Sequence, residues 1–511
     1  MIRNRWGIIL GYCLIAVESI SGILFTSILL KSLDNDEYGL YRLVMSWTSV
    51  VSILDFGLGG TITRYVVKYK TEKDKDGEQN FLGMAFISYA VIAAIVFIVG
   101  AALCIVLPAV SQSIQGAQIA KSRYIFAISI LKVCVVLFNH AYFGWFTANE
   151  RFVYIKGITI LFTVSRIFFI FLLLPMKPSA VTVVCIDLLL TIIQLFLNVV
   201  FSRKLTETKI KLLKWDNKLF KEILLFTSSI FLGAIINQFN SNVDNIILGM
   251  FTTTVIVGLY SSAMQIYTMY SNLSTAIQEV YLPQISKAIF RNENDTEITK
   301  ELIVPSRLQI VILMLAFLGF IAFGQQFFYL WIGKSYSLNQ IREIYFITIL
   351  VMGSATLQLS QNCVTCVLKA KNILKGKVII TGISTIVNLV LTLVLVKIWG
   401  MVGAAIGTAF SMLFGYGIAL NIFYKKRAGI DLRLFFTNVY ARIWIVFIII
   451  LIGSVVLALY PTTNIWVLII EALSFVIIYF VLIYIIGLKK QEKDKINKIV
   501  LSKILSKRKK I

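Results

Sequence analysis

The chain has 511 residues, of which 58% are hydrophobic and 14% are charged, whereas about a quarter of the residues in a soluble domain are charged. It contains 49 Lys and Arg against 25 Asp and Glu, which gives a formal net charge of +24. This composition excludes a soluble enzyme and a disordered chain, and it does not fit the short alternating strands of an outer-membrane barrel. Because a transmembrane helix needs about 20 apolar residues, the chain has room for about 14 spans.

Apolar stretches of spanning length recur along the whole chain, with connections too short to form a separate soluble domain. They predict an all-α polytopic membrane protein with about 14 transmembrane helices. The predicted spans are residues 8–30, 40–62, 81–107, 123–146, 153–174, 179–202, 221–249, 254–283, 306–329, 343–368, 376–397, 400–423, 441–460 and 464–487.

Basic residues gather in alternate connections, at residues 63–75, 203–221, 369–377 and 425–427 and in the tail. The intervening loops are poor in them. Because Lys and Arg accumulate on the cytoplasmic side, both termini are predicted to be cytoplasmic. The same distribution explains the positive net charge, so we expect no nucleic-acid partner.

Cysteine and histidine offer little metal or redox chemistry. Cys363 and Cys366 have CxxC spacing, but they lie within a predicted span without a second pair, so they are interpreted as small buried hydrophobes. The chain has one histidine, His140, and no second histidine to complete a zinc site, so a zinc site or a His-based catalytic triad is not expected. We therefore expect no metal and no cofactor, apart from a coupling ion.

An internal repeat links the two halves of the chain. Glu37–Tyr41 and Ile256–Tyr260 open the second and eighth predicted spans at an offset of 219 residues. The repeat predicts two pseudo-symmetric six-helix lobes followed by two C-terminal helices. The predicted parts are an N-terminal lobe 1–202, a basic cytoplasmic linker 203–220, a C-terminal lobe 221–424, spans 13 and 14 within 425–487, and a basic cytoplasmic tail 488–511.

Polar side chains recur on one helical face in several spans, although each costs free energy if it faces hydrocarbon. They either join helices through hydrogen bonds or line a hydrated cavity, and their number favours the cavity. The main stripes are Thr48, Ser52, Asp55 and Gly59; Thr159, Thr163 and Arg166; Asp187, Thr191, Gln194 and Asn198; Gly233, Asn237, Asn240 and Asp244; Ser261, Gln265, Thr268 and Asn272; Ser354, Gln358, Gln361 and Thr365; and Thr381, Thr385, Asn388 and Thr392.

Charged residues also fall deep within the predicted spans. A cation at mid-depth costs at least about 2.5 kcal/mol, so Lys132 and Arg166 need water, an acidic partner or an anionic substrate. They either form internal ion pairs or bind a phosphate in the cavity. The predicted substrate-binding residues are Arg166, Lys132, Asn139, Gln194, Gln265, Gln358 and Asn388. The candidates for coupling to a proton or sodium ion, or for pairing with the cations, are Glu18, Asp55, Asp187 and Asp244.

Several segments, taken together with the span plan, carry a family resemblance that covers nearly the whole chain. They are Tyr38–Tyr41, Leu54–Gly60 and Arg64–Tyr65; Ala148–Phe152; Asp244–Leu248 and Val257–Tyr260; Leu330–Gly333; and Gly400–Gly407. With these segments the chain resembles the polysaccharide and O-antigen flippases of the multidrug/oligosaccharidyl-lipid/polysaccharide (MOP) exporter superfamily.

The resemblance implies two lobes around a central cavity that opens alternately to either side of the bacterial cytoplasmic membrane. It implies an undecaprenyl-diphosphate-linked oligosaccharide as cargo, an ion gradient as the driving force, and membrane lipids, a polysaccharide polymerase and glycosyltransferases as partners. Arg166 and Lys132 suit a cationic cavity on physical grounds alone, since they match no family motif.

Two other functions fit less well. A multidrug or other small-molecule cation antiporter of the same fold predicts a cavity dominated by acids, whereas acids and bases are mixed here. A membrane polymerase or glycosyltransferase predicts a large external loop with clustered catalytic side chains, and none is predicted. The sequence therefore favours a transporter over an enzyme.

Overall fold

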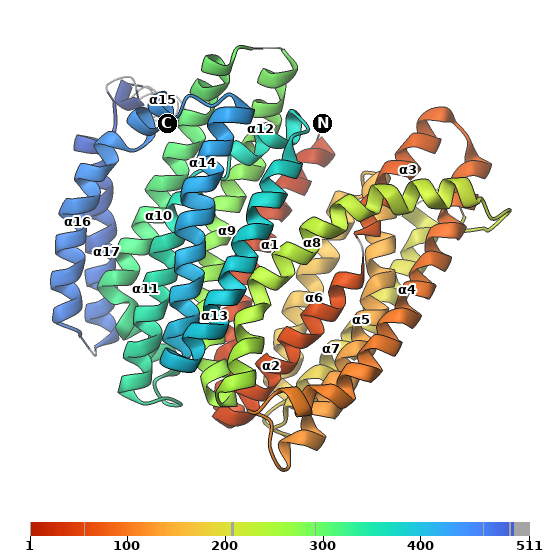
Figure 1. Cartoon of the computed structure of the whole chain (residues 1–511), viewed down its shortest axis with the longest axis horizontal. Coiled ribbons are helices and arrows are strands. Elements are labelled where there is room, and N and C mark those ends of the chain that lie inside the picture. The colour runs from red at the N-terminus through yellow and green to blue at the C-terminus, as the bar shows by residue number, and fades with distance from the viewer. Residues whose placement is uncertain are drawn as a thin grey trace, which may run out of the picture. The chain divides into compact units, whose positions relative to one another are not determined.

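The structure is a computed structural model that describes residues 2–55, 57–205, 209–291, 293–462, 464–489 and 492–494. In these residues it contains seventeen α-helices with short 3-10 and π segments, and no strand (Figure 1). This confirms the all-α class. Phe56, three residues of the predicted linker and most of the predicted basic tail lie outside the described residues.

The chain divides into two compact units. Unit 1 comprises Met1–Gln265 and Thr381–Ser411, and unit 2 comprises Ile266–Ile380 and Met412–Ile511. This division follows contacts in space, and helices α9 (Thr254–Phe290) and α13 (Leu374–Ser411) each pass from one unit to the other. The lobe boundaries drawn from the sequence repeat therefore stay a prediction.

Unit 1 holds most of the N-terminal helices, among which α4, α5 and α7 pack side by side (Figure 1). Besides the first part of α9 and most of α13, its elements are α1 (Ile2–Ser32), α2 (Asn35–Val51), η1 (Ser52–Asp55), α3 (Leu58–Glu72), α4 (Lys75–Val110), α5 (Gln118–Ala148), α6 (Phe152–Leu173), α7 (Ala180–Leu205) and α8 (Asn217–Phe251).

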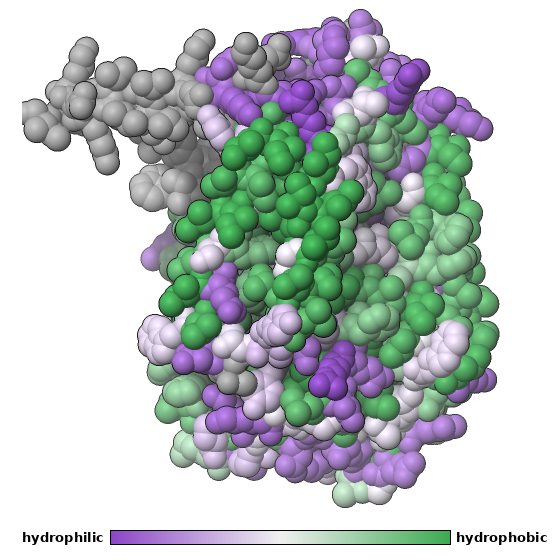
Figure 2. Space-filling view, turned by 90° about the vertical axis from the view of Figure 1, so that its left-hand side faces the viewer, coloured by the Kyte–Doolittle hydropathy of each residue, from purple (hydrophilic) through white to green (hydrophobic). Residues whose placement is uncertain are grey.

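Unit 2 is organised around α10, which packs against α11, α16 and α17. Its other elements are α10 (Asp295–Ile332), α11 (Leu338–Ser360), α12 (Val364–Ala370), η2 (Met412–Ala419), α14 (Leu420–Phe423), η3 (Tyr424–Ala428), α15 (Leu432–Val439), α16 (Ala441–Leu459), α17 (Ile465–Leu482) and η4 (Ile483–Gly487). On the side of α16 and α17, apolar side chains cover the middle and polar ones gather towards both ends (Figure 2). Such an apolar band is expected of helices that face lipid.

Eleven helical segments of the described chain are long and apolar enough to cross a membrane. Most predicted spans coincide with helix, but 40–62 is interrupted between η1 and α3, and 343–368 between α11 and α12. The spans 221–249 and 254–283 match α8 and α9, which are not among the eleven, and 376–397 and 400–423 fall in the segment Leu374–Ala428. The protein is a multi-pass membrane protein, while the number of its spans and the side of its termini stay predictions.

The long helix α13 is a helical hairpin. Gly400 interrupts it with φ 55° and ψ −132°, a backbone conformation that glycine adopts without a steric penalty. Beyond Gly400 the chain reverses direction and packs against the preceding arm. The Ser411 hydroxyl, for example, donates to the Ser384 carbonyl at 2.6 Å. A Cβ at Gly403 would lie 2.2 Å from the Leu395 carbonyl oxygen, so the two arms are in close contact. The two predicted spans in this region are thus the two arms of one hairpin.

The repeat seen in the sequence recurs in the helix boundaries of unit 1. Helices α1 and α8 end at Ser32 and Phe251, and α2 and α9 begin at Asn35 and Thr254, in both cases 219 residues apart. The break between the first and second helix is therefore identical in the two repeats.

Side-chain contacts show that these equivalent segments pack with approximate two-fold symmetry. Thr26 donates to Gln265 at 2.7 Å, and Asn245 donates to Ser46 at 3.1 Å; the repeat offset converts one pair into the other. Arg42 donates to the carbonyl of Ser261, its own equivalent position, at 3.3 Å. The α1–α2 and α8–α9 corners are therefore related by a local two-fold axis that passes near Arg42.

Candidate functional site

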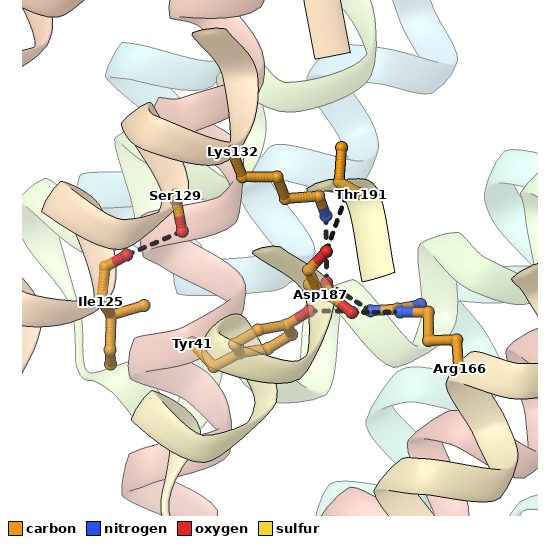
Figure 3. A network of polar contacts seen from close by, with 7 residues as sticks. All are labelled: Tyr41, Ile125, Ser129, Lys132, Arg166, Asp187 and Thr191. Atoms are coloured by element: carbon orange, nitrogen blue, oxygen red, sulfur yellow. Dashed lines mark hydrogen bonds and ion pairs between the residues drawn. The ribbon is translucent and has the colours of Figure 1, made fainter. Parts of the chain in front are cut away.

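Three charged side chains from α5, α6 and α7 meet inside unit 1 (Figure 3). Arg166 donates from Nε to Asp187 Oδ1 at 2.6 Å and from Nη2 to Asp187 Oδ2 at 3.0 Å. Lys132 donates to Asp187 Oδ2 at 3.0 Å. Lys132 and Arg166, both predicted to bind phosphate, thus share Asp187, which was predicted as an ion-coupling residue. The cluster of two cations and one anion has a net charge of +1.

The cluster opens on a cavity of about 180 Å³ lined by the predicted stripes of α6 and α7. The side chain of Asp187 is only 2% exposed, whereas those of Lys132 and Arg166 are 30% and 32% exposed. The acid is therefore enclosed and the cations face the cavity. The cavity is lined by Lys132, Thr159, Phe162, Thr163, Arg166, Asp187, Leu190, Thr191 and Gln194.

Aromatic side chains from two further helices hold Arg166 in place. Its Nη2 also donates to the Tyr41 hydroxyl of α2 at 3.3 Å. Its guanidinium lies 4.1 Å from the centre of the Phe25 ring of α1, within the range of a cation–π interaction. An arginine held from three sides keeps a fixed direction, which favours recognition of an anion over a mobile ion pair.

Asn139 takes part in packing instead of lining this cavity. It is 3% exposed, and it donates to the Thr191 carbonyl at 3.3 Å and accepts from Asn198 at 2.7 Å. Tyr154 completes the chain of bonds by donating to Asn198 at 2.9 Å. These contacts fasten α5, α6 and α7 to one another.

A second cluster surrounds Asp244, which is 6% exposed. Its Oδ2 accepts from Tyr260 at 2.6 Å and from Thr408 at 2.7 Å, and its Oδ1 accepts from Thr392 at 3.5 Å. The side-chain oxygen Oδ1 of Asn388 accepts from the Thr392 hydroxyl at 3.0 Å, and the side-chain nitrogen Nδ2 of Asn388 has no hydrogen-bond partner in the described part of the chain. In contrast to Asp187, the acid is surrounded by hydroxyl groups.

Asp55 lies in η1, where the second predicted span is broken. Its Oδ2 is 3.1 Å from His140 Nδ1 of α5. Both side chains line a further cavity of about 300 Å³ beside Gly57, Gly59 and Gly60.

The remaining predicted site residues lie apart from these clusters. Glu18 is exposed on α1, where its carboxylate is attracted by the positive charge of Lys156. Gln265 is bonded to Thr26 in the α1–α9 contact. Gln358 belongs to unit 2, where its Oε1 is buried without a hydrogen-bond partner among the described residues.

Several side chains in these clusters were not among the predicted site residues, and the main ones are Phe25, Tyr41, His140, Tyr260 and Thr408. Phe25 and Tyr41 give no polar signal in an apolar helix, and Thr408 belongs to none of the polar stripes found in the sequence. The repeat offset links two of these residues, since Tyr41 and Tyr260 occupy equivalent positions and both form a hydrogen bond with a charged side chain.

A family model described as polysaccharide biosynthesis protein matches residues 6–289, which is more than half of the chain. The chain belongs to the polysaccharide biosynthesis protein family. This confirms the predicted recognition.

One curated relative of the chain is the probable low-salt glycan biosynthesis flippase Agl15 of Haloferax volcanii. It is 28% identical over 181 residues, which cover 35% of this chain and 37% of Agl15. The match thus spans little more than a third of that relative.

Solved structures with the same fold are transporters of the MOP superfamily. The lipid II flippase MurJ in an inward closed conformation gives a TM-score of 0.72 at 14% identity, over 93% of this chain and 97% of MurJ. An inward-facing multidrug resistance MATE transporter gives 0.68 at 12% identity, over 80% and 96%. A MOP transporter from Pyrococcus furiosus gives 0.56 at 15% identity, over 83% and 96%. At such identities the likeness establishes the fold alone, which agrees with the predicted superfamily.

Proposed function

We propose that this protein is a flippase that moves an undecaprenyl-diphosphate-linked oligosaccharide from the cytoplasmic to the outer leaflet of a bacterial cytoplasmic membrane. Its family membership and its similarity to a glycan flippase support a glycan cargo. The observation that carries the proposal is the net positive pocket formed by Arg166, Lys132 and Asp187 within helices of spanning length.

The pocket suits the diphosphate of such a cargo. A diphosphate and sugar hydroxyls cannot enter hydrocarbon without losing their hydrogen bonds to water, so unaided transfer is prohibitively slow. Guanidinium and ammonium groups replace that hydration with charge-assisted hydrogen bonds. The partly exposed Arg166 and Lys132 supply these donors, while Thr159, Thr163 and Gln194 supply neutral ones. The lipid tail stays in the bilayer, and alternating access moves the head group.

The energy source in this proposal is a proton or sodium gradient, and buried acids are the side chains that such ions bind. Asp244 is a candidate because its described hydrogen bonds come from hydroxyl groups, and Asp55 is a second. Asp187 is the counter-ion of two cations, so its proposed role is to hold them. An uncoupler or a sodium ionophore is expected to stop net translocation.

The cationic pocket is tested by charge removal at Arg166 in proteoliposomes that contain a fluorescent undecaprenyl-diphosphate-linked oligosaccharide. Arg166→Gln should reduce the translocation rate by at least about tenfold, since one charge-assisted contact to a phosphate is worth about 1.5–3 kcal/mol, and Arg166→Lys should retain more activity. The matched control is Lys397→Gln, which removes an exposed cation that lies over the Phe251 ring in the same unit and outside the pocket.

The double variant Arg166→Gln/Asp187→Asn separates binding from folding. If Arg166 only neutralised Asp187, removing both charges would restore transport. We expect the double variant to stay inactive although it inserts normally. Unchanged transport in Arg166→Gln, or efflux of small organic cations without any glycan transport, would contradict the proposal.

A further inference from the structure

Asp55 and His140 lie where a transmembrane helical run is broken. Helix α2 ends at Val51, η1 ends at Asp55, and α3 begins at Leu58 after Gly57 with a φ of 69°. Discontinuous helices expose backbone groups that must be satisfied, so in membranes they occur beside cavities and buried partners. Here the break adjoins a cavity of about 300 Å³.

The lining of this cavity contains two titratable side chains, Asp55 and His140. The other lining residues are the neutral Gly57, Gly59, Gly60, Thr63, Phe143, Gly144 and Thr147. The imidazole of His140 is 46% exposed, whereas the carboxylate of Asp55 is 22% exposed. An ionisable pair of this kind inside a membrane helix bundle is costly and needs a functional reason.

The helices packed around the pair add one more titratable group. Tyr89 of α4 faces Asp55, and its hydroxyl lies close enough to interact with this carboxylate. From α8, Gln238 donates to the Ser49 carbonyl and approaches Ser52, and both contacts are neutral. No described contact therefore supplies a fixed cation to this carboxylate.

We propose that Asp55 and His140 form the proton-binding site through which this transporter uses a proton gradient, an inference that rests on the proposed transport function. A neutral imidazole whose Nδ1–H donates to Asp55 Oδ2 leaves its Nε2 lone pair free. Nε2 takes up one proton from the water-filled cavity and becomes part of an imidazolium–carboxylate pair. The same proton leaves from Nε2 when the cavity opens to the other side. Sodium is a poor alternative, because a ring nitrogen is not the hard oxygen ligand that such a cation prefers.

The position of Asp55 explains how this proton acts on the cargo site. Tyr41, which bonds to Arg166, and Asp55 belong to one helical run, α2 followed by η1. Gly59 and Gly144 lie so close that a Cβ on Gly144 would be 2.4 Å from the Gly59 carbonyl oxygen, so α3 and α5 are in contact just beyond the break. Charging His140 on α5 strengthens its attraction to Asp55 and thus changes the restraint on the segment that also carries Tyr41.

The transport experiment compares His140→Gln and Asp55→Asn with Phe143→Leu, which changes the same cavity without removing a titratable group. In proteoliposomes with the same fluorescent lipid-linked oligosaccharide, a pH gradient should accelerate wild-type translocation about tenfold, within the usual range of coupling. His140→Gln and Asp55→Asn should lose this acceleration but keep gradient-free exchange of cargo, and Phe143→Leu should keep both. Acceleration that persists in His140→Gln, or that a sodium gradient drives equally, would overturn the proposal.

A second measurement does not depend on transport. His140 is the one histidine of the chain, so protein labelled with ¹⁵N-histidine gives a single imidazole whose ¹⁵N signals report its protonation. These signals should change with pH in the full-length protein, and the change should move when Asp55→Asn removes the carboxylate. Signals that Asp55→Asn leaves unchanged would refute the pairing. Absence of glycan transport in the wild type would instead refute the proposed function.

Discussion

The equivalent tyrosines of the α1–α2/α8–α9 repeat contact charged groups of opposite sign. In the first half, Tyr41 bonds to Arg166 and Phe25 lies against the same guanidinium. In the second, the residues 219 positions later are Tyr260 and Asp244, which bond to each other. A phenol can accept from a cation or donate to an anion, so one backbone arrangement supports both. The repeat therefore conserves geometry, while the residue facing the tyrosine sets the sign of the charge.

The comparison also shows two ways of stabilising a charged side chain inside the helix bundle. Beside Tyr41, two cations of α5 and α6 are paired with Asp187 of α7 and stay partly exposed to a cavity. Beside Tyr260, hydroxyl groups surround Asp244. The first arrangement suits an anionic ligand and the second a small cation or proton. The following substitutions test this difference, in order of decreasing expected effect.

Asp187→Asn should destabilise the protein most, because it leaves two cations without their shared counter-ion. Removal of one partner from a buried pair costs about 3–5 kcal/mol, and Asp187 is the most enclosed member of its cluster. Denaturation in detergent, monitored by circular dichroism, measures the change, with the exposed Asp34→Asn as control. A loss of stability no greater than that of the control would show that the cations do not depend on Asp187.

Gly39→Ala should disrupt the contact between the two repeats. A Cβ at this position would lie 1.8 Å from the backbone oxygen of Thr254. Overpacking costs about 1–3 kcal/mol, and here about 3 kcal/mol or more is expected because the backbone has to move. Gly157→Ala is the matched control, since a Cβ there meets no atom within 4 Å. Equal thermal stability of the two variants in detergent would mean that the repeats do not pack as closely as described.

Tyr260→Phe should cost more than Tyr41→Phe. The Tyr260 hydroxyl donates to Asp244 at 2.6 Å, and hydrogen bonds to a charged group contribute about 1.5–3 kcal/mol. The Tyr41 hydroxyl accepts a longer bond of 3.3 Å from Arg166, which keeps its bonds to Asp187, so about 0.5–1.5 kcal/mol is expected. Unfolding midpoints of both variants give the comparison, and the reverse order would contradict it.

Much of the lining of the candidate site could be predicted, because polar residues that recur on one face of an apolar helix indicate that this face is turned away from lipid. The stripe Thr159, Thr163 and Arg166 and the stripe Asp187, Thr191 and Gln194 do line one cavity. The hypotheses of ion pairing and of phosphate binding both stay compatible with the cluster, since Arg166 is paired with Asp187 and still partly exposed. Asn139 shows the limit of the method, because a polar residue that packs helices has the same spacing as one that lines a cavity.

The sequence by itself determined that this is an all-helical membrane protein with a repeat and with charges at mid-depth, because the length and periodicity of apolar segments are local properties. Only the tertiary structure decided which polar groups meet: that Lys132 and Arg166 share Asp187, that Asp55 joins His140, and that Thr408 reaches Asp244 from the second arm of the α13 hairpin. The physical reason is that partners between 21 and 164 residues apart along the chain are chosen by the packing of helices, and side-chain spacing within one helix carries no record of that choice.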